Sequence, residues 1–202
     1  MSTLKQPARS CRCEIIPTDT PRVLTRCRRC KRTTEFYCSE NFRMNAQQKT
    51  LDVWLIYRCT RCDSTWNREI VSRLHTDALD NELRRYFAAN DRETAWRYAF
   101  EIDRLRRLTD GVQTDIPYRL ELDRSLPEAG LFSLVLACAH PFELRLGKVL
   151  AELLGVSRSE LERWAEAGRL RFDDPRLTLR SKLTAEVRVA VDRGEPRLPD
   201  GR

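Results

Sequence analysis

Two Cys-x-x-Cys pairs constrain the fold of this chain more than any other feature of its sequence. Cys27 and Cys30 form the first pair, Cys59 and Cys62 form the second, and residues 31–58 separate them. Each pair makes a tight turn that brings two thiolates together, and two such turns supply the four ligands of a tetrahedral zinc site. A hairpin would fill the intervening segment, as in zinc ribbons, so we expect a structural Zn²⁺ at these four cysteines.

The four thiolates also bear on catalysis. They leave no open coordination position for water or substrate, so we expect the metal to be structural and the protein not to be an enzyme. Without zinc the small module should unfold. Cys38 and Cys138 lie in apolar strand patterns and are expected to be small core residues. Cys11 and Cys13 have no partner pair, and are either ordinary thiols or additional metal ligands.

Charge and composition limit the location and partners of the protein. The 202 residues carry a formal charge of +7 and 41% hydrophobic residues, and the pI is about 9.2. A basic excess suits a polyanionic partner but is also common in ordinary cytosolic proteins. No apolar run is long enough for a membrane span, and the first residues lack the apolar core of a secretory signal. We therefore expect a cytoplasmic protein with no membrane partner.

Hydrophobic periodicity predicts an α+β fold in two parts. The segment "LDVWLIYRC" alternates apolar and polar positions like a strand, whereas "TDALDNELRRYFAAN" and "NDRETAWRYAFEIDRLRRLTDG" have helical periodicity. Asn90 and Glu93 are expected to cap the second helix. The predicted organisation is disorder over 1–10, a zinc ribbon over 11–75, a helical hairpin over 76–111, a connector over 112–130 with one strand near 118–122, a second domain over 131–193 and a tail over 194–202.

Basic residues crowd both cysteine pairs: Arg26, Arg28, Arg29, Lys31, Arg32, Arg58 and Arg61. They have two possible roles. They can offset the net negative charge of a four-thiolate zinc site, or they can form a surface that binds phosphate groups. The sequence favours neither role over the other.

The segment "LGKVLAELLGVSRSELERWAEAGRL", residues 146–170, predicts two helices joined by a short turn. Ser157 and Glu160 form a capping box, and Gly155 and Gly168 suit the two helix ends. Such a pair can be a DNA-binding helix-turn-helix, part of an RNA-binding fold or a simple packing element. The second helix carries Glu162 and Glu166 on the side that would enter a DNA groove, which disfavours DNA.

The residues around this helix pair resemble the RNA-binding domain first described in ribosomal protein S-four. Arg145, Leu146 and Lys148 match the opening of that domain, Ser157 and Arg158 match the start of its second helix, and "EVRVAV" matches its last strand. Gly147 stands where the family has Asp, and Asp173-Asp174 replaces the usual Asn-Gly turn. The resemblance implies that structured RNA binds at Arg145, Lys148, Ser157, Arg158, Arg169 and Arg171.

Over its whole length the chain resembles a bacterial family of unknown function, DUF1062. The resemblance rests on "RCRRC", "FRMNAQQKTLDVWLIYRCTRCDSTWN", "RYAFEIDRL" and "LGKVLAELLGVSRSELERW". The resemblance implies the two-part architecture, and the family brings no established activity with it. The sequence thus predicts a non-catalytic zinc-ribbon protein that binds ribosomal or transfer RNA through its C-terminal domain. The alternatives are a DNA-binding regulator and an adaptor that binds a protein partner.

Overall fold

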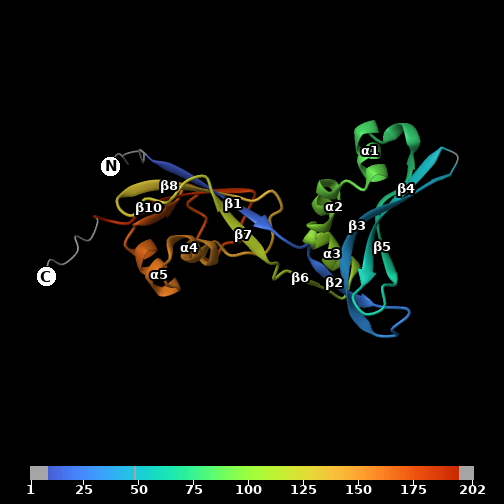
Figure 1. Cartoon of the computed structure of the whole chain (residues 1–202), viewed down its shortest axis with the longest axis horizontal. Coiled ribbons are helices and arrows are strands. Elements are labelled where there is room, and N and C mark those ends of the chain that lie inside the picture. Colours follow the sequence, from blue (N-terminus) through green and yellow to red (C-terminus); the bar gives the residue numbers. More distant parts are fainter. Residues whose placement is uncertain (1–8, 48, 196–202) are drawn as a thin grey trace. The chain divides into compact units, whose positions relative to one another are not determined.

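The computed structural model describes residues 9–47 and 49–195, which form two compact units (Figure 1). Unit 2 comprises residues 18–117, whereas unit 1 comprises the chain before and after it. At the two ends of unit 2, the Thr18 amide donates a hydrogen bond of 2.8 Å to the Pro117 carbonyl. Unit 2 is therefore inserted into unit 1. The predicted α+β class is confirmed, since both units combine a sheet with helices.

Unit 2 is built on a five-stranded antiparallel sheet of order β5-β4-β3-β2-β6. Its strands are β2 (Arg22–Arg26), β3 (Thr33–Gln47), β4 (Thr50–Cys59), β5 (Thr65–His75) and β6 (Gly111–Gln113). The predicted hairpin is β3 paired with β4. Strand β6 falls at the start of the segment that we predicted to be a connector. Its Val112 pairs with Val23 of β2, so this segment forms the edge strand of the sheet.

The segment predicted as a two-helix hairpin, residues 76–111, differs in the structure. It holds the 3-10 turn η1 (Thr76–Ala78) and three short helices, α1 (Asn81–Ala89), α2 (Arg92–Ala99) and α3 (Ile102–Leu108). Asn90 ends α1 with a left-handed φ of 52°, and Asp91 caps α2 in its place. The prediction of one long second helix is wrong because that helix breaks at Phe100–Glu101.

A buried arginine accounts for the break between α2 and α3. Arg68 of β5 is fully buried, donates a hydrogen bond to the Tyr98 carbonyl and pairs with the Glu101 carboxylate. In a continuous helix the Tyr98 carbonyl would accept from Ile102. Instead the Ile102 amide donates to Phe100 at 2.8 Å. The arginine thus docks the helices on the sheet at the cost of helix continuity.

The helices of unit 2 cover one face of its sheet (Figure 1). Strand β4 shows the division most clearly, because its odd-numbered residues from Leu51 to Cys59 are buried and its even-numbered ones are partly exposed. The buried residues of the sheet pack against those of the helices in two clusters, which include Val23, Phe36, Leu55, Tyr57, Ala95, Ala99 and Leu105 in one and Leu51, Val53, Leu79 and Phe87 in the other.

Unit 1 has a mixed five-stranded sheet of order β7-β1-β8-β10-β9. The strands are β1 (Ser10–Pro17), β7 (Tyr118–Leu122), β8 (Leu131–Ala137), β9 (Leu170–Phe172) and β10 (Glu186–Asp192). Strand β1 runs parallel to β8 and antiparallel to β7. Residues 11–17, which we expected in the ribbon, therefore belong to the other sheet, and so does the strand of the predicted connector. Most of the predicted terminal segments lies outside the described residues.

The helices of unit 1 are α4 (Leu146–Leu154) and α5 (Arg158–Glu166), at the positions predicted. Gly155 ends α4 with a φ of 67°, and the Ser157 hydroxyl caps α5 by accepting from the Glu160 amide at 3.2 Å. Buried residues of this unit include Cys11, Cys13, Leu134, Leu136, Leu146, Leu150, Leu161, Val187 and Val189. Alternation along β1 and β10 leaves their other side chains outside the core.

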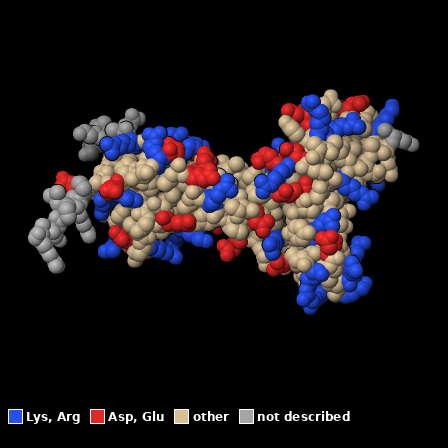
Figure 2. Space-filling view, viewed as in Figure 1, with Lys and Arg blue, Asp and Glu red and all other residues tan. Residues whose placement is uncertain are grey.

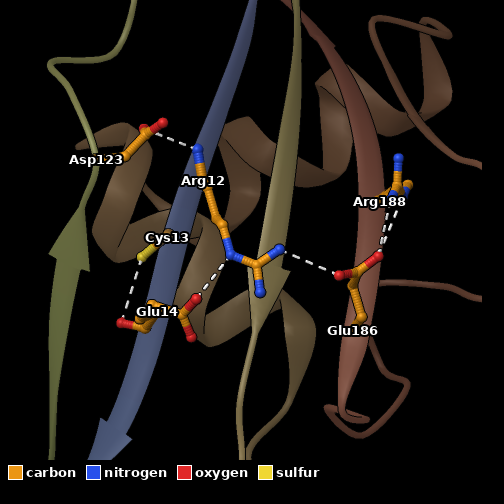
Figure 3. Close-up of polar contacts among 6 residues, drawn as sticks. All are labelled: Arg12, Cys13, Glu14, Asp123, Glu186 and Arg188. Carbon is orange, nitrogen blue, oxygen red and sulfur yellow. Dashed lines mark hydrogen bonds and ion pairs between the residues drawn. The ribbon is translucent and has the colours of Figure 1, made fainter.

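Charged side chains on that other face pair with one another. Arg12 of β1 bonds to Glu14 at 2.7 Å and reaches across β8 to Glu186 of β10 at 3.1 Å (Figure 3). Arg188 bonds to the same Glu186 carboxylate at 2.9 Å. The charges of these four side chains, Arg12, Glu14, Glu186 and Arg188, therefore offset one another.

Gly147 permits a close approach of two segments of unit 1. Its amide donates to the Leu179 carbonyl at 2.8 Å, and a Cβ at this position would lie only 2.9 Å from the same oxygen. An aspartate, which the resemblance to ribosomal protein S-four places here, would collide with that backbone. The glycine is thus a requirement of this fold.

Candidate metal centre and phosphate-binding surface

The two Cys-x-x-Cys turns have matching backbone geometry. The first follows β2 and the second ends β4. The Cys27 carbonyl accepts from the Lys31 amide at 2.9 Å, and the Cys59 carbonyl accepts from the Asp63 amide at 3.0 Å. Lys31 and Asp63 both have a φ of 59°, in the left-handed region. The two Cys-x-x-Cys motifs therefore have the same backbone structure. We call these two turns the knuckles (residues 27–32 and 59–64).

The knuckles bring the four predicted cysteines together. The four Sγ atoms lie within 4.8 Å of one another, and Cys27 and Cys62 are separated by 3.5 Å, Cys30 and Cys59 by 4.0 Å. These separations fit a tetrahedron of sulfur around one ion with bonds of roughly 2.3 Å. All eight cysteines are free thiols. The four-cysteine cluster can therefore hold a metal ion.

Hydrogen bonds favour a thiolate at Cys27. Its Sγ lies 3.1 Å from the Ser64 hydroxyl and accepts from the Cys30 amide at 3.3 Å, which lowers the pKa of Cys27 to about 6. The hydrogen bond with Cys62, together with burial, raises the pKa of Cys30 to about 12. Without a cation the cluster thus resists a second negative charge. A divalent ion removes that penalty, so metal binding should release the remaining thiol protons.

The other four cysteines are buried and lie outside the cluster: Cys11, Cys13, Cys38 and Cys138. Cys11 and Cys13 face the core of unit 1, opposite Leu134 and Leu136 of β8. Burial raises the pKa of Cys13 to about 11 and that of Cys38 to about 12. These thiols stay neutral near pH 7 and act as core side chains.

Cations surround the knuckles without carboxylate partners. Six of the seven basic residues named from the sequence are exposed, and within the described residues none of the six forms an ion pair: Arg26, Arg28, Arg29, Lys31, Arg32 and Arg61. We call these the knuckle cations. The seventh, Arg58, pairs with Asp63 at 2.5 Å. Figure 2 shows Lys and Arg gathered at the end of unit 2 where both knuckles lie.

The predicted nucleic-acid residues of unit 1 are mostly engaged within the fold. At the start of α4, Arg145 donates to the Arg180 carbonyl, and the Lys148 ammonium lies 5.6 Å from the centroid of the Tyr118 ring. At the start of α5, Ser157 serves as the cap. The Arg158 side chain, although 76% exposed, pairs with Glu162 at 3.2 Å.

The last two predicted residues lie beside β9. Arg169 stacks over Trp164, with its guanidinium carbon 4.8 Å from the ring centroid, and donates to the Asp192 carbonyl at 3.0 Å. Arg171 is exposed and, within the part of the chain that the structure describes, makes no side-chain hydrogen bond, ion pair or ring contact. Unit 1 therefore offers fewer uncommitted cations than its sequence indicated.

A groove of about 710 Å³ adjoins Arg171 in unit 1. Helix α5, strand β9 and the segment after it supply the lining, which includes Glu162, Glu166, Leu170, Arg171, Phe172, Leu177, Leu179 and Arg180. Its floor is apolar and its charges are of both signs. Such a lining suits a peptide or a small amphiphile better than a polyanion.

Three further residues, which the sequence argument did not select, lie on the face of the unit 2 sheet opposite the helices. Trp54 of β4 and the directly opposite Arg43 of β3 are two of them, and Tyr37 of β3, opposite Arg58, is the third. The alternation that marks Leu51, Val53 and Leu55 as core residues also directs Trp54 outward. The sequence therefore contained the signal for this surface.

None of the helices in the described residues is long and apolar enough to cross a bilayer. The model of a family described as "Protein of unknown function (DUF1062)" matches residues 44–176, a range that contains the second knuckle and starts after the first. Neither a curated protein nor a solved structure matches the chain. The resemblance to the domain of ribosomal protein S-four therefore stays a prediction.

Proposed function

The chain belongs to the DUF1062 family of proteins of unknown function, and from its own residues we propose that it is a non-catalytic, cytoplasmic RNA-binding protein with a structural zinc ion. Four thiolates suit zinc and disfavour ions that prefer oxygen ligands, such as Mg²⁺ and Ca²⁺, and they leave no coordination position for a reactant. Eight free thiols are in keeping with a reducing compartment.

The knuckle cations carry this proposal. A zinc ion with four thiolates has formally two negative charges, which two cations would offset. Six exposed cations lie in or beside the knuckles, and Asp63, the one carboxylate within residues 27–32 and 59–64, is already paired with Arg58. The excess positive charge has no partner in the described chain. A row of phosphate groups is the partner that such a cluster fits, since each cation gains by displacing a condensed counterion.

Unit 1 supplies a weaker second contact in this proposal. Arg171 is available for a phosphate group, and Arg145 and Lys148 are exposed although engaged. The exposed side of α5 is unsuited to a DNA groove, because Arg158 is neutralised by Glu162 and Glu166 is exposed. RNA is thus favoured over duplex DNA. The groove beside β9 supports the alternative of a protein partner, which would bind unit 1.

The direct test is fluorescence anisotropy of labelled RNA mixed with the zinc-loaded chain. We expect binding, and we expect the double variant Arg28→Glu/Arg29→Glu to lose it. The matched control is Arg84→Glu/Arg85→Glu, which reverses two exposed cations on helix α1 of the same unit. Equal loss in both variants would indicate only a net-charge effect. No loss in the first variant would refute the knuckles as the RNA contact.

A further inference from the structure

The open face of the unit 2 sheet carries aromatic and basic side chains together. Helices α1, α2 and α3 cover the other face (Figure 1). The core clusters include the odd-numbered residues Val53, Leu55 and Tyr57 of β4 and omit Trp54 and Ile56. Trp54 and Ile56 are partly exposed, and so is Tyr37 of β3. In a soluble protein, aromatic rings on an uncovered sheet face are candidates for a binding surface.

Trp54 lies at the centre of this face. It stands directly opposite Arg43 on β3 and Glu69 on β5. Within the described residues, the Trp54 indole has neither a hydrogen bond nor a ring contact, and Arg43 has no ion pair. A partly buried indole usually finds a partner for its N–H group. The ring and the neighbouring guanidinium are therefore both available to a ligand.

Tyr37 joins this centre to the knuckles. It lies opposite Arg58, and its hydroxyl donates to the Asp63 carboxylate of the second knuckle at 3.2 Å. Arg58 is four positions after Trp54 on β4, which corresponds to about 13 Å along the strand. Rings and cations thus follow one another from Trp54 to the knuckle cations. We call this sequence of side chains the aromatic track, made of Arg43, Trp54, Ile56, Tyr37 and Arg58.

We propose that the aromatic track binds a single-stranded segment of RNA, with bases stacked on Trp54 and Tyr37 and phosphates on Arg43 and the knuckle cations. This inference rests on the proposed RNA-binding function and specifies its substrate. Every base has a face that can stack on an aromatic ring, but pairing in a duplex hides that face. The surface therefore selects unpaired RNA, whereas cations alone would accept a duplex equally well.

The test compares labelled oligouridine, which forms no hairpin, with an RNA duplex of the same length. The zinc-loaded full chain should bind the single strand more tightly. Trp54→Ala should weaken that binding about tenfold, the effect of losing one stacked base, and Trp54→Phe should retain most of it. The control is Tyr86→Ala, which removes a 40% exposed ring on helix α1 of the same unit. Zinc content and circular dichroism check the fold of each variant.

Two further readouts separate stacking from charge. Trp54→Ala should leave the salt dependence of binding unchanged because it removes no charge, whereas Arg28→Ala/Arg29→Ala should reduce it. Oligouridine should quench the intrinsic fluorescence of the native chain and quench that of Trp54→Phe less. The second measurement remains informative if the alanine variant fails to fold.

The outcomes are distinguishable. If the native chain binds no RNA, the proposed function and this inference both fail. If it binds RNA but Trp54→Ala binds equally well, or the duplex binds as tightly as the single strand, the inference is wrong and the proposed function stands. An oligothymidine strand identifies the nucleic acid, because binding of that DNA without binding of the RNA would overturn the assignment to RNA.

Discussion

Removal of the metal should unfold unit 2 and leave unit 1 folded, because all four cysteine ligands lie in unit 2. The proposed zinc ion would cross-link the two knuckles and so join Cys30 to Cys59. Closing a loop of that length stabilises the folded unit by roughly 4 kcal/mol through the entropy of the unfolded chain. A single domain is stable by only about 5–15 kcal/mol. Losing this cross-link together with the metal–sulfur bonds of the proposed zinc ion should therefore cost more than the free energy of unfolding of unit 2.

Hydrogen exchange followed by mass spectrometry gives the required resolution. After chelation, with zinc release verified by native mass spectrometry, amides of β3, β4 and β5 should lose protection while those of β8 and β10 keep it. Cys59→Ala should have the same effect without chelator. Cys138→Ala is the control, since it removes a buried thiol outside the cluster. Full protection of metal-free unit 2 would refute a structural role for the ion.

Three other predictions concern charge, packing and titration. If all six knuckle cations contact phosphates of a single strand, the logarithm of the RNA affinity should fall by about 4 for each tenfold increase in salt. In Arg28→Ala/Arg29→Ala it should fall by about 3. Titrations at several salt concentrations would measure both slopes. Gly147→Ala should destabilise unit 1 by about 1–3 kcal/mol in urea unfolding, because its methyl group has no room; unchanged stability would contradict the close approach. Bonds from the Arg176 side chain and from its backbone amide lower the pKa of Asp174 to about 2. This partly exposed carboxylate therefore favours the folded state above its ordinary pKa, and the effect is lost as pH falls toward 2. Carboxyl NMR should show that Arg176→Ala raises the pKa of Asp174 toward its ordinary value, with the part due to the backbone amide retained.

The metal cluster was predictable because its determinants are local. A Cys-x-x-Cys turn forms from four consecutive residues, and the spacer between two turns need only be long enough for a hairpin. Helices α4 and α5 were equally predictable from the sequence, since Gly155 ends α4 and Ser157 caps α5 through short-range hydrogen bonds.

The location of β1 was not predictable in this way. Alternation shows which side of a strand is buried, and Cys11 and Cys13 are on that side, but it does not show which sheet the strand joins. Its partners are β7 and β8, more than a hundred residues later in the chain. The break between α2 and α3 has a similar cause, because Arg68 lies on a strand remote from the helical segment that it interrupts.

The insertion of unit 2 has a consequence for the order of events during synthesis. Strand β1 leaves the ribosome long before its partners, because β7 spans residues 118–122 and β8 spans residues 131–137. At roughly 5–20 residues per second, that wait lasts several seconds or longer. The synthesis of unit 2 is complete before this wait ends. Unit 2 can therefore fold while the apolar side of β1 is still without a sheet. Cys11 and Cys13, inert in the finished protein, are open to oxidants and chaperones during that interval.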